Sequence, residues 1–119
     1  MIRNLLGATL LMAMAAIPAN AATRACVGYV DFVYVRDDGS AYVKTTWSQS
    51  SHQVCNVKAD WKGITPDLCL SWMAQLGVAI AYGKNTRIDY RDIPSCGTLP
   101  SNDSAPAPLF IMVRHETRP

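Results

Sequence analysis

The chain has 119 residues, of which 50% are hydrophobic and 17% charged, and its formal net charge at neutral pH is +2. A chain of this length forms one domain with a modest core. The small net charge gives no basic stripe of the kind that nucleic-acid-binding proteins carry, so we expect no nucleic-acid partner.

The first residues have the three parts of an export signal. Arg3 supplies a positive start, the apolar run LLGATLLMAMAAI follows, and Ala19-Asn20-Ala21 offers small residues for cleavage. We predict a signal peptide over residues 1–21 and a single disulfide-bonded domain over residues 22–119. The alternative is an uncleaved anchor, but the apolar run is shorter than the about 18 residues that a spanning helix needs. We expect a secreted or periplasmic protein of bacterial type that does not insert into a membrane after signal cleavage.

All of the cysteines follow this signal, at Cys26, Cys55, Cys69 and Cys96. An even number of cysteines in an oxidising compartment favours disulfides, which stabilise small domains. The alternative is a zinc site completed by a histidine, but the cysteines form no C-x-x-C pair. We therefore predict two disulfides, no metal and no cofactor.

The first half of the chain has the composition of three strands. Residues 27–36 and 41–47 are rich in β-branched and aromatic residues, and the turn former Asp37-Asp38-Gly39-Ser40 between them predicts a hairpin. Residues 52–58 form the third predicted strand. Asp31 lies inside the first strand, and we expect it to face outward and pair with Arg87 or Arg91.

A helix is predicted over about residues 66–83. Thr65 can cap its start, Pro66 suits the first helical position, and Gly83 suits its end. Helical periodicity places one group of residues on the core side: Cys69, Trp72, Met73, Leu76, Ala79, Ile80 and Gly83. The opposite side, which includes Val78 and Tyr82, is only partly polar. This helix is therefore expected to be covered on its second side too.

Two further strands are predicted after the helix. Residues 86–92 alternate, with Ile88 and Tyr90 expected in the core and Asp89 expected in solvent. Residues 93–108 form a proline-rich loop. The continuous apolar run within residues 109–115 suggests a last strand that is buried on both sides.

The resulting order, β-β-β-α-β-β, is that of the OB-fold, a five-stranded, partly open Greek-key barrel. The alternative is an α+β sandwich with a helix across one face of an antiparallel sheet. In an OB barrel the first and fourth strands are antiparallel neighbours, so Cys26 would meet Cys96. Cys55 and Cys69 then remain to join the helix to the third strand. We predict these two pairs, out of three possible connectivities.

No residue constellation indicates a reaction. The candidate bases are His52 and His115, the four thiols are assigned to disulfides, and neither G-x-S-x-G nor H-E-x-x-H occurs. Asp37 and Asp38 fit a solvated turn better than a catalytic carboxylate pair. We therefore expect a protein that is not an enzyme.

Aromatic residues are plentiful for a domain of this size. Tyrosine and tryptophan beside hydroxyls and carboxylates suit the recognition of oligosaccharides by stacking and hydrogen bonding. The alternative is structural, because small β-barrels also fill their cores and rims with aromatic residues. The residues in question are Tyr29, Phe32, Tyr34, Tyr42, Trp47, Trp61, Tyr82 and Tyr90.

One long run, VCNVKADWKGITPDLCLSWMAQLGVAIAYGKNTRIDY, resembles the B subunits of the subtilase-cytotoxin and typhoid-toxin-like AB5 toxins. The resemblance covers about residues 30–92. Its cysteines differ, because those toxins have a cysteine on the second strand, where Tyr42 or Val43 stands here. The matching features are Val54-Cys55, Ile64, Leu76, Ala79, Ala81, Gly83-Lys84 and Arg87-Ile88.

This resemblance implies an OB-fold subunit with one glycan site, assembled as a homopentamer with an enzymatic A subunit. The family's glycan-contacting serine follows the first strand, and Ser40 matches it here, flanked by Asp38 and Tyr42. We therefore expect a secreted, carbohydrate-binding module whose partner is a glycan or glycoprotein. The alternative is a periplasmic inhibitor or immunity-type protein that blocks an enzyme through the 93–108 loop, which Cys96 tethers.

Overall fold

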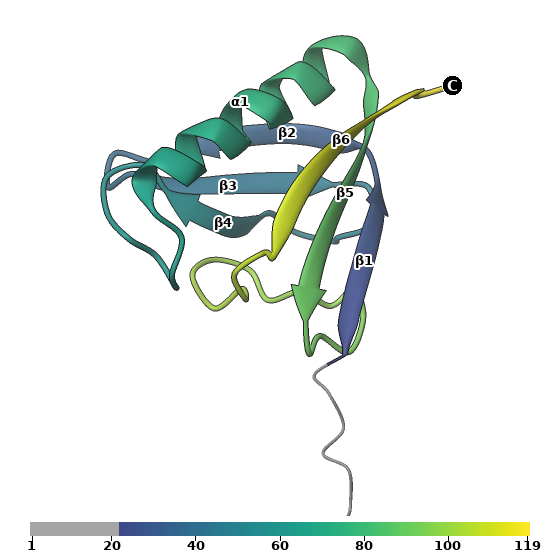
Figure 1. The fold of residues 1–119 in the computed structure, drawn as a ribbon. Helices are drawn as coiled ribbons and strands as arrows, with labels where there is room; N and C mark the ends of the chain where they lie inside the picture. Colours follow the sequence, from purple (N-terminus) through teal and green to yellow (C-terminus); the bar gives the residue numbers. More distant parts are fainter. Residues whose placement is uncertain (1–21) are drawn as a thin grey trace, which may run out of the picture.

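The computed structural model describes residues 22–119 (Figure 1). The predicted signal peptide lies outside the described residues. The fold is mainly β with one helix, as the sequence indicates. Its elements are β1 (Thr23–Gly28), β2 (Val30–Val35), β3 (Ser40–Thr45), β4 (His52–Asn56), α1 (Pro66–Tyr82), β5 (Lys84–Arg91) and β6 (Phe110–Thr117).

The strands form two antiparallel sheets of three strands each. Sheet A has the order β1-β5-β6, and sheet B has the order β2-β3-β4. Figure 1 shows the strands of sheet A crossing those of sheet B, with α1 lying across the top of both. Within residues 22–119 no backbone ladder joins the two sheets into a closed barrel.

The first predicted strand is in fact two strands, which gives six strands rather than five. The chain leaves β1 at Gly28, where β1 pairs with β5, and enters β2 at Val30, where β2 pairs with β3. A side chain at Gly28 would collide with the Thr46 hydroxyl. That hydroxyl accepts the backbone N–H of Tyr29 at 3.0 Å, so it fixes the chain where it crosses between the sheets.

Helix α1 covers the core that the two sheets enclose. Thr65 caps its start by accepting the backbone N–H of Leu68, and Gly83 ends it with a φ of 60°. The residues that α1 buries are Cys69, Trp72, Leu76 and Ala79. Ile80 was expected on this side but is 38% exposed, so the buried stripe is narrower than predicted.

The structure contains the disulfides Cys26–Cys96 and Cys55–Cys69, the same pairs as those predicted. The first joins β1 to the loop after β5, and the second joins β4 to the beginning of α1. No cysteine in the described chain is free. Two disulfides indicate an oxidising compartment, extracellular or periplasmic. None of the helices within residues 22–119 is long and apolar enough to span a membrane.

Two burial predictions in sheet A are wrong. The last strand was expected to be buried on both sides, but β6 is an edge strand and its Met112 is 43% exposed. Asp89 was expected in solvent but is only 5% exposed. Its carboxylate accepts hydrogen bonds from the Arg87 guanidinium at 2.8 and 3.0 Å. Because this charge is paired and hydrogen-bonded, the strand can bury it.

Candidate functional site

The predicted ligand residues lie where the hairpin of β2 and β3 turns. Gly39 has a φ of 88°, a conformation that favours glycine. Asp38 is exposed, and its Oδ1 accepts the backbone N–H of Ser40 at 2.9 Å. Hydrogen bonds from the Ser40 hydroxyl and backbone lower the pKa of the Asp38 carboxyl. Asp38 therefore presents a fixed carboxylate at neutral pH.

Ser40 and Tyr42 are close to Asp38 but much less accessible. They are 6% and 3% exposed. Both lie on β3 two residues apart, so their side chains share the outer face of sheet B. The side chains of Ala41 and Val43 point to the opposite face and pack in the core. The structure thus brings the three predicted residues together, with Asp38 as the one open to solvent. Ser40 acts on this surface mainly by holding Asp38.

Tyr42 is covered by an aromatic row on β2, whose members Phe32 and Tyr34 were among the aromatic candidates but were not grouped with Tyr42 from the sequence. The Tyr34 ring stacks on Tyr42 with 4.9 Å between ring centroids and 6° between ring planes. The Phe32 ring follows at 6.2 Å from Tyr34. Phe32 and Tyr34 are 49% and 41% exposed. The sequence signal that could have found this row is the alternation Phe32-x-Tyr34 opposite Tyr42 across a hairpin.

Polar groups surround the aromatic row. The Tyr34 hydroxyl lies 3.1 Å from the Ser51 hydroxyl. Hydrogen bonding to Tyr42 and the nearby carboxylate of Asp38 raise the pKa of the exposed Arg36 guanidinium. We call this surface, made by Phe32, Tyr34, Arg36, Asp38, Ser40 and Tyr42, the aromatic face. It combines exposed rings with a guanidinium, a carboxylate and hydroxyls.

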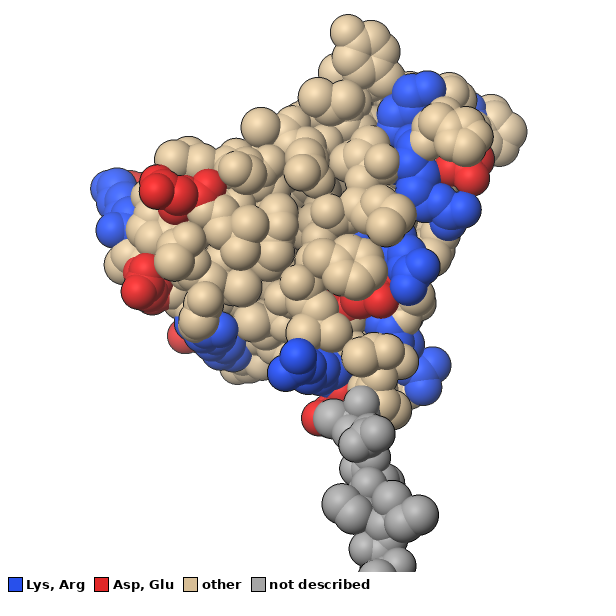
Figure 2. Space-filling model, in the orientation of Figure 1, with Lys and Arg blue, Asp and Glu red and all other residues tan. Residues whose placement is uncertain are grey.

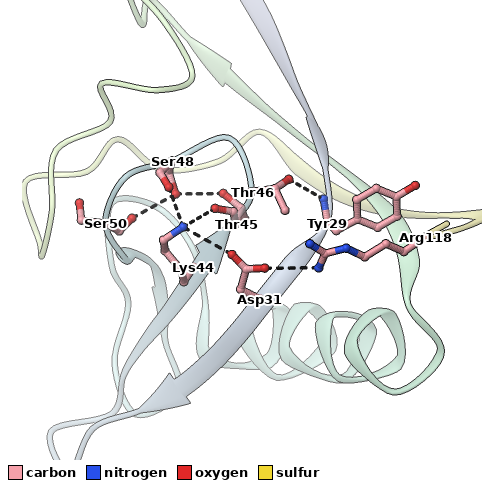
Figure 3. A network of polar contacts seen from close by, with 8 residues as sticks. All are labelled: Tyr29, Asp31, Lys44, Thr45, Thr46, Ser48, Ser50 and Arg118. Carbon is pink, nitrogen blue, oxygen red and sulfur yellow. Dashed lines mark hydrogen bonds and ion pairs between the residues drawn. The ribbon is translucent and has the colours of Figure 1, made fainter.

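A second polar cluster lies at the beginning of β2 (Figure 3). The Lys44 ammonium donates to the carbonyls of Thr45 and Ser48 at 2.6 and 2.7 Å and lies 3.5 Å from the Asp31 carboxylate. The other oxygen of that carboxylate lies 3.5 Å from the Arg118 guanidinium. These groups satisfy one another, so the cluster ties the C-terminal end of the chain to sheet B.

The predicted partners of Asp31 were therefore wrong. Arg87 and Arg91 lie on β5, whose neighbours are β1 and β6. Asp31 lies on β2, and the break at Tyr29 moves it from sheet A to sheet B, where β3 is its neighbour. The prediction failed because it treated residues 27–36 as one strand beside β5.

A buried pair joins the two sheets. His52 on β4 is fully buried, and its Nε2 lies 2.8 Å from the Tyr90 hydroxyl on β5. Burial lowers the pKa of His52 to about 4 and raises the pKa of Tyr90. Both side chains are therefore neutral at neutral pH, and they link sheet A to sheet B.

The 93–108 loop is held against the body of the domain. Leu99 and Ala105 are buried. The Lys62 ammonium donates to the backbone carbonyls of Asp103 and Ala105 at 2.8 and 2.6 Å. The loop therefore has a defined conformation between its disulfide and β6.

Within residues 22–119, no cluster of three or more His, Cys, Asp or Glu side chains is arranged to hold a metal ion, and no pocket is found. Comparisons of the chain with protein-family models, with curated proteins and with solved structures give no match. The candidate site is therefore identified from its residues and their geometry.

Proposed function

We propose that the protein is a secreted, non-enzymatic module that binds a glycan or glycoprotein through the aromatic face. The observation that carries this proposal is the exposed Tyr34 ring stacked on Tyr42, with the exposed Phe32 ring beside it. Sugar rings have apolar C–H faces that stack on aromatic rings, and their hydroxyls need polar partners placed beside those rings.

The polar residues of the aromatic face supply those partners. The Asp38 carboxylate accepts hydrogen bonds from sugar hydroxyls, and Arg36 donates to sugar oxygens. Ser40 holds Asp38 in place through the hydrogen bond at 2.9 Å. Tyr42 supports Tyr34 from beneath, which keeps the exposed ring in one orientation before the ligand arrives.

The connectivity of the sheets supports an OB-fold as the framework of this function. If β1 and β2 count as one bent strand, the neighbour order β4-β3-β2/β1-β5-β6, with α1 between β4 and β5, follows that of a partly open Greek-key barrel. In OB-folds the loop after the first strand contributes to oligosaccharide binding. Here that loop contains Asp37 and Asp38.

The resemblance to AB5 toxin B subunits implies two further partners, a ring of five copies and an enzymatic A subunit. Glycan binding by the aromatic face requires neither of them, because its residues all lie on one hairpin of one chain. The native mass of the oxidised protein tests the ring directly, since a pentamer would have about five times the mass of one chain.

The binding experiment compares two exposed tyrosines. A glycan array screened with the oxidised protein identifies a ligand, and calorimetry then measures its affinity for Tyr34→Ala and Tyr82→Ala. We expect Tyr34→Ala to weaken binding about tenfold or more, because it removes the stacking ring. Tyr82 is 68% exposed on α1, away from the aromatic face, so its variant is the matched control. Unchanged affinity in Tyr34→Ala would contradict the proposed site.

A second candidate function is inhibition of an enzyme through the 93–108 loop. It is favoured by the way this loop is held. The exposed tip, residues 100–104, lies between the buried residues Leu99 and Ala105, and the Lys62 ammonium binds the carbonyls of Asp103 and Ala105. A preorganised loop loses little entropy when it binds. Replacement of residues 100–104 by glycine and serine would abolish inhibition and leave glycan binding unchanged, whereas Tyr34→Ala would do the reverse.

A further inference from the structure

The outer side of helix α1 carries apolar residues as well as the uncharged polar residues Ser71 and Gln75. Leu70, Val78 and Tyr82 are 55%, 50% and 68% exposed. No residue between Asp67 and Lys84 is charged. A surface helix normally sets charged residues opposite its buried stripe, and a helix that is apolar all round is normally covered on both sides. In Figure 1 no element of the described chain covers the outer side of α1.

The outer side carries a regular line of exposed residues. They follow one another at alternating spacings of three and four residues, so they lie on one side of the helix, as in the contact line of paired helices. The small residues in the middle of this line allow a second backbone to approach closely, and the space above Gly77 is empty to 4 Å from a Cβ position. We call this line the outer stripe; its members are Asp67, Leu70, Ala74, Gly77 and Ala81.

The two ends of α1 carry opposite charges. Asp67 stands in the first turn. Lys84 follows Gly83 at the start of β5. Arg118 lies beside it, because its backbone N–H donates to the Gly83 carbonyl at 2.7 Å, and its guanidinium pairs with Asp31. The Lys84 ammonium donates twice within the chain and has a third proton left. Figure 2 shows an uncharged surface over α1, with red and blue side chains together near its N-terminal end and mostly blue ones near its C-terminal end.

We propose that the outer stripe binds a second copy of this chain, with the two α1 helices antiparallel about a two-fold axis. An axis midway between Ala74 and Gly77 sets Leu70 against Ala81 of the partner subunit. The same axis brings the N-terminal end of α1, with Asp67, to the C-terminal end of the partner helix, which Lys84 of the partner subunit follows at the start of β5. The charged ends then attract each other, and the two helix dipoles oppose.

Other occupants fit this surface less well. A parallel arrangement of helices around a channel would place equal charges side by side at each end. A lipid surface favours large apolar side chains in the centre of the contact, where the outer stripe has alanine and glycine. The antiparallel pair is therefore the assembly that the charges and side-chain sizes support, and it does not depend on glycan binding.

The association is expected to be weak. A helix of 17 residues is about 25 Å long, and one side of it buries less than the roughly 800 Å² per partner of a standard interface. We expect a dimer that dissociates in the micromolar range, so the mass measured by light scattering and sedimentation should rise with protein concentration.

The test uses charge variants on exposed positions of the oxidised protein. Ala74→Glu puts two carboxylates near the axis and should weaken the dimer at least about a hundredfold. Met112→Glu is the matched control, because Met112 is exposed on β6 and lies outside the outer stripe. Ala81→Glu serves as a second stripe variant if Ala74→Glu does not fold. Asp67→Lys, which sets equal charges together at the ends, should weaken the dimer about twofold to fivefold.

Dimers in the wild type and in Met112→Glu, with monomers in Ala74→Glu or Ala81→Glu, would support the proposal. A wild-type protein that stays monomeric at millimolar concentration would overturn it, as would a mass of five subunits. A dimer that persists in both stripe variants would place the interface elsewhere. A wild-type monomer that instead co-sediments with phosphatidylcholine vesicles would assign the outer stripe to lipid and overturn the dimer.

Discussion

The aromatic face and the outer stripe both expose apolar residues, but they differ in what accompanies those residues. On the aromatic face, Tyr34 stands beside a guanidinium, a carboxylate and hydroxyls that already have defined hydrogen-bond geometry. On the outer stripe, Asp67 in the first turn is the one charged residue, and the members from Leu70 to Ala81 are apolar. A polar ligand such as a sugar needs the first kind of surface, whereas a protein helix fits the second.

The two surfaces are also supported in different ways. The aromatic face is built by one hairpin, whose strands pair through backbone hydrogen bonds. Helix α1 makes its contacts with the sheets through side chains and through the Cys55–Cys69 disulfide. This difference means that a local change can alter one surface and leave the other intact.

Acid should weaken both surfaces together, because it acts on the link between the sheets. The pKa of His52 is lowered to about 4 in the folded protein from 6.5. The unfolded chain therefore binds more protons between these values, and the free energy of unfolding falls as pH drops from about 6.5 to about 4. The loss is about 3 kcal/mol, at about 1.4 kcal/mol for each pH unit.

Urea unfolding at a series of pH values measures this loss. The variant His52→Gln has no titrating imidazole, so its stability should change less over the same range even if it starts lower. An identical pH dependence in His52→Gln would show that the acid sensitivity has another origin.

Removal of the second disulfide should separate the two surfaces. In Cys55→Ala/Cys69→Ala the loop of 14 residues is no longer closed, which should cost about 2–3 kcal/mol of the free energy of unfolding. Because the hairpin of β2 and β3 does not depend on this bond, glycan affinity should persist where the variant is folded. Guanidinium unfolding and calorimetry on the same sample measure the two quantities. Equal losses of stability and of affinity would show that the surfaces are coupled.

The sequence predicted what local chemistry determines. Thr65 and Gly83 mark the ends of α1 because a cap and a left-handed residue are properties of a few neighbouring residues. The turn that holds Asp38 beside Ser40 is local in the same sense. The two disulfides followed from the order of the elements, which places Cys26 and Cys96 at the meeting ends of antiparallel strands.

The sequence did not predict what distant contacts determine. The break at Tyr29 depends on Thr46, which lies on the far side of the hairpin. The burial of Asp89 depends on the paired guanidinium of Arg87, and an alternating pattern of residues cannot show such a pair. The exposure of Tyr34 depends on the register that sets it opposite Tyr42. Each of these features combines residues whose pairing is fixed by the assembled sheets.

Ser40→Ala tests whether the aromatic face owes its specificity to a held carboxylate. The variant removes the hydroxyl that helps to fix Asp38 but leaves the backbone hydrogen bond at 2.9 Å. One hydrogen bond contributes about 0.5–1.5 kcal/mol, so glycan affinity should fall about twofold to tenfold. Calorimetry at neutral pH measures the change. Ser71→Ala, an exposed serine on α1, is the control and should bind as the wild type does.

Gly77→Ala gives the smallest predicted effect, and it tests whether the outer side of α1 is unoccupied in a single chain. Gly77 lies inside the helix, and apart from its chain neighbours and the adjacent helix backbone no heavy atom of the described chain lies within 4 Å of an added Cβ. Alanine is favoured over glycine in a helix by up to about 1 kcal/mol, so the variant should raise the free energy of unfolding by about 0.5–1 kcal/mol. Urea unfolding at nanomolar protein, where the proposed dimer is dissociated, measures this gain.

At high concentration the methyl group added at Gly77 stands in the closest part of the antiparallel contact, so the stabilising effect should shrink as the protein concentration rises. A gain that is independent of concentration would mean that the space above Gly77 stays empty, which would contradict the proposed pairing of the helices.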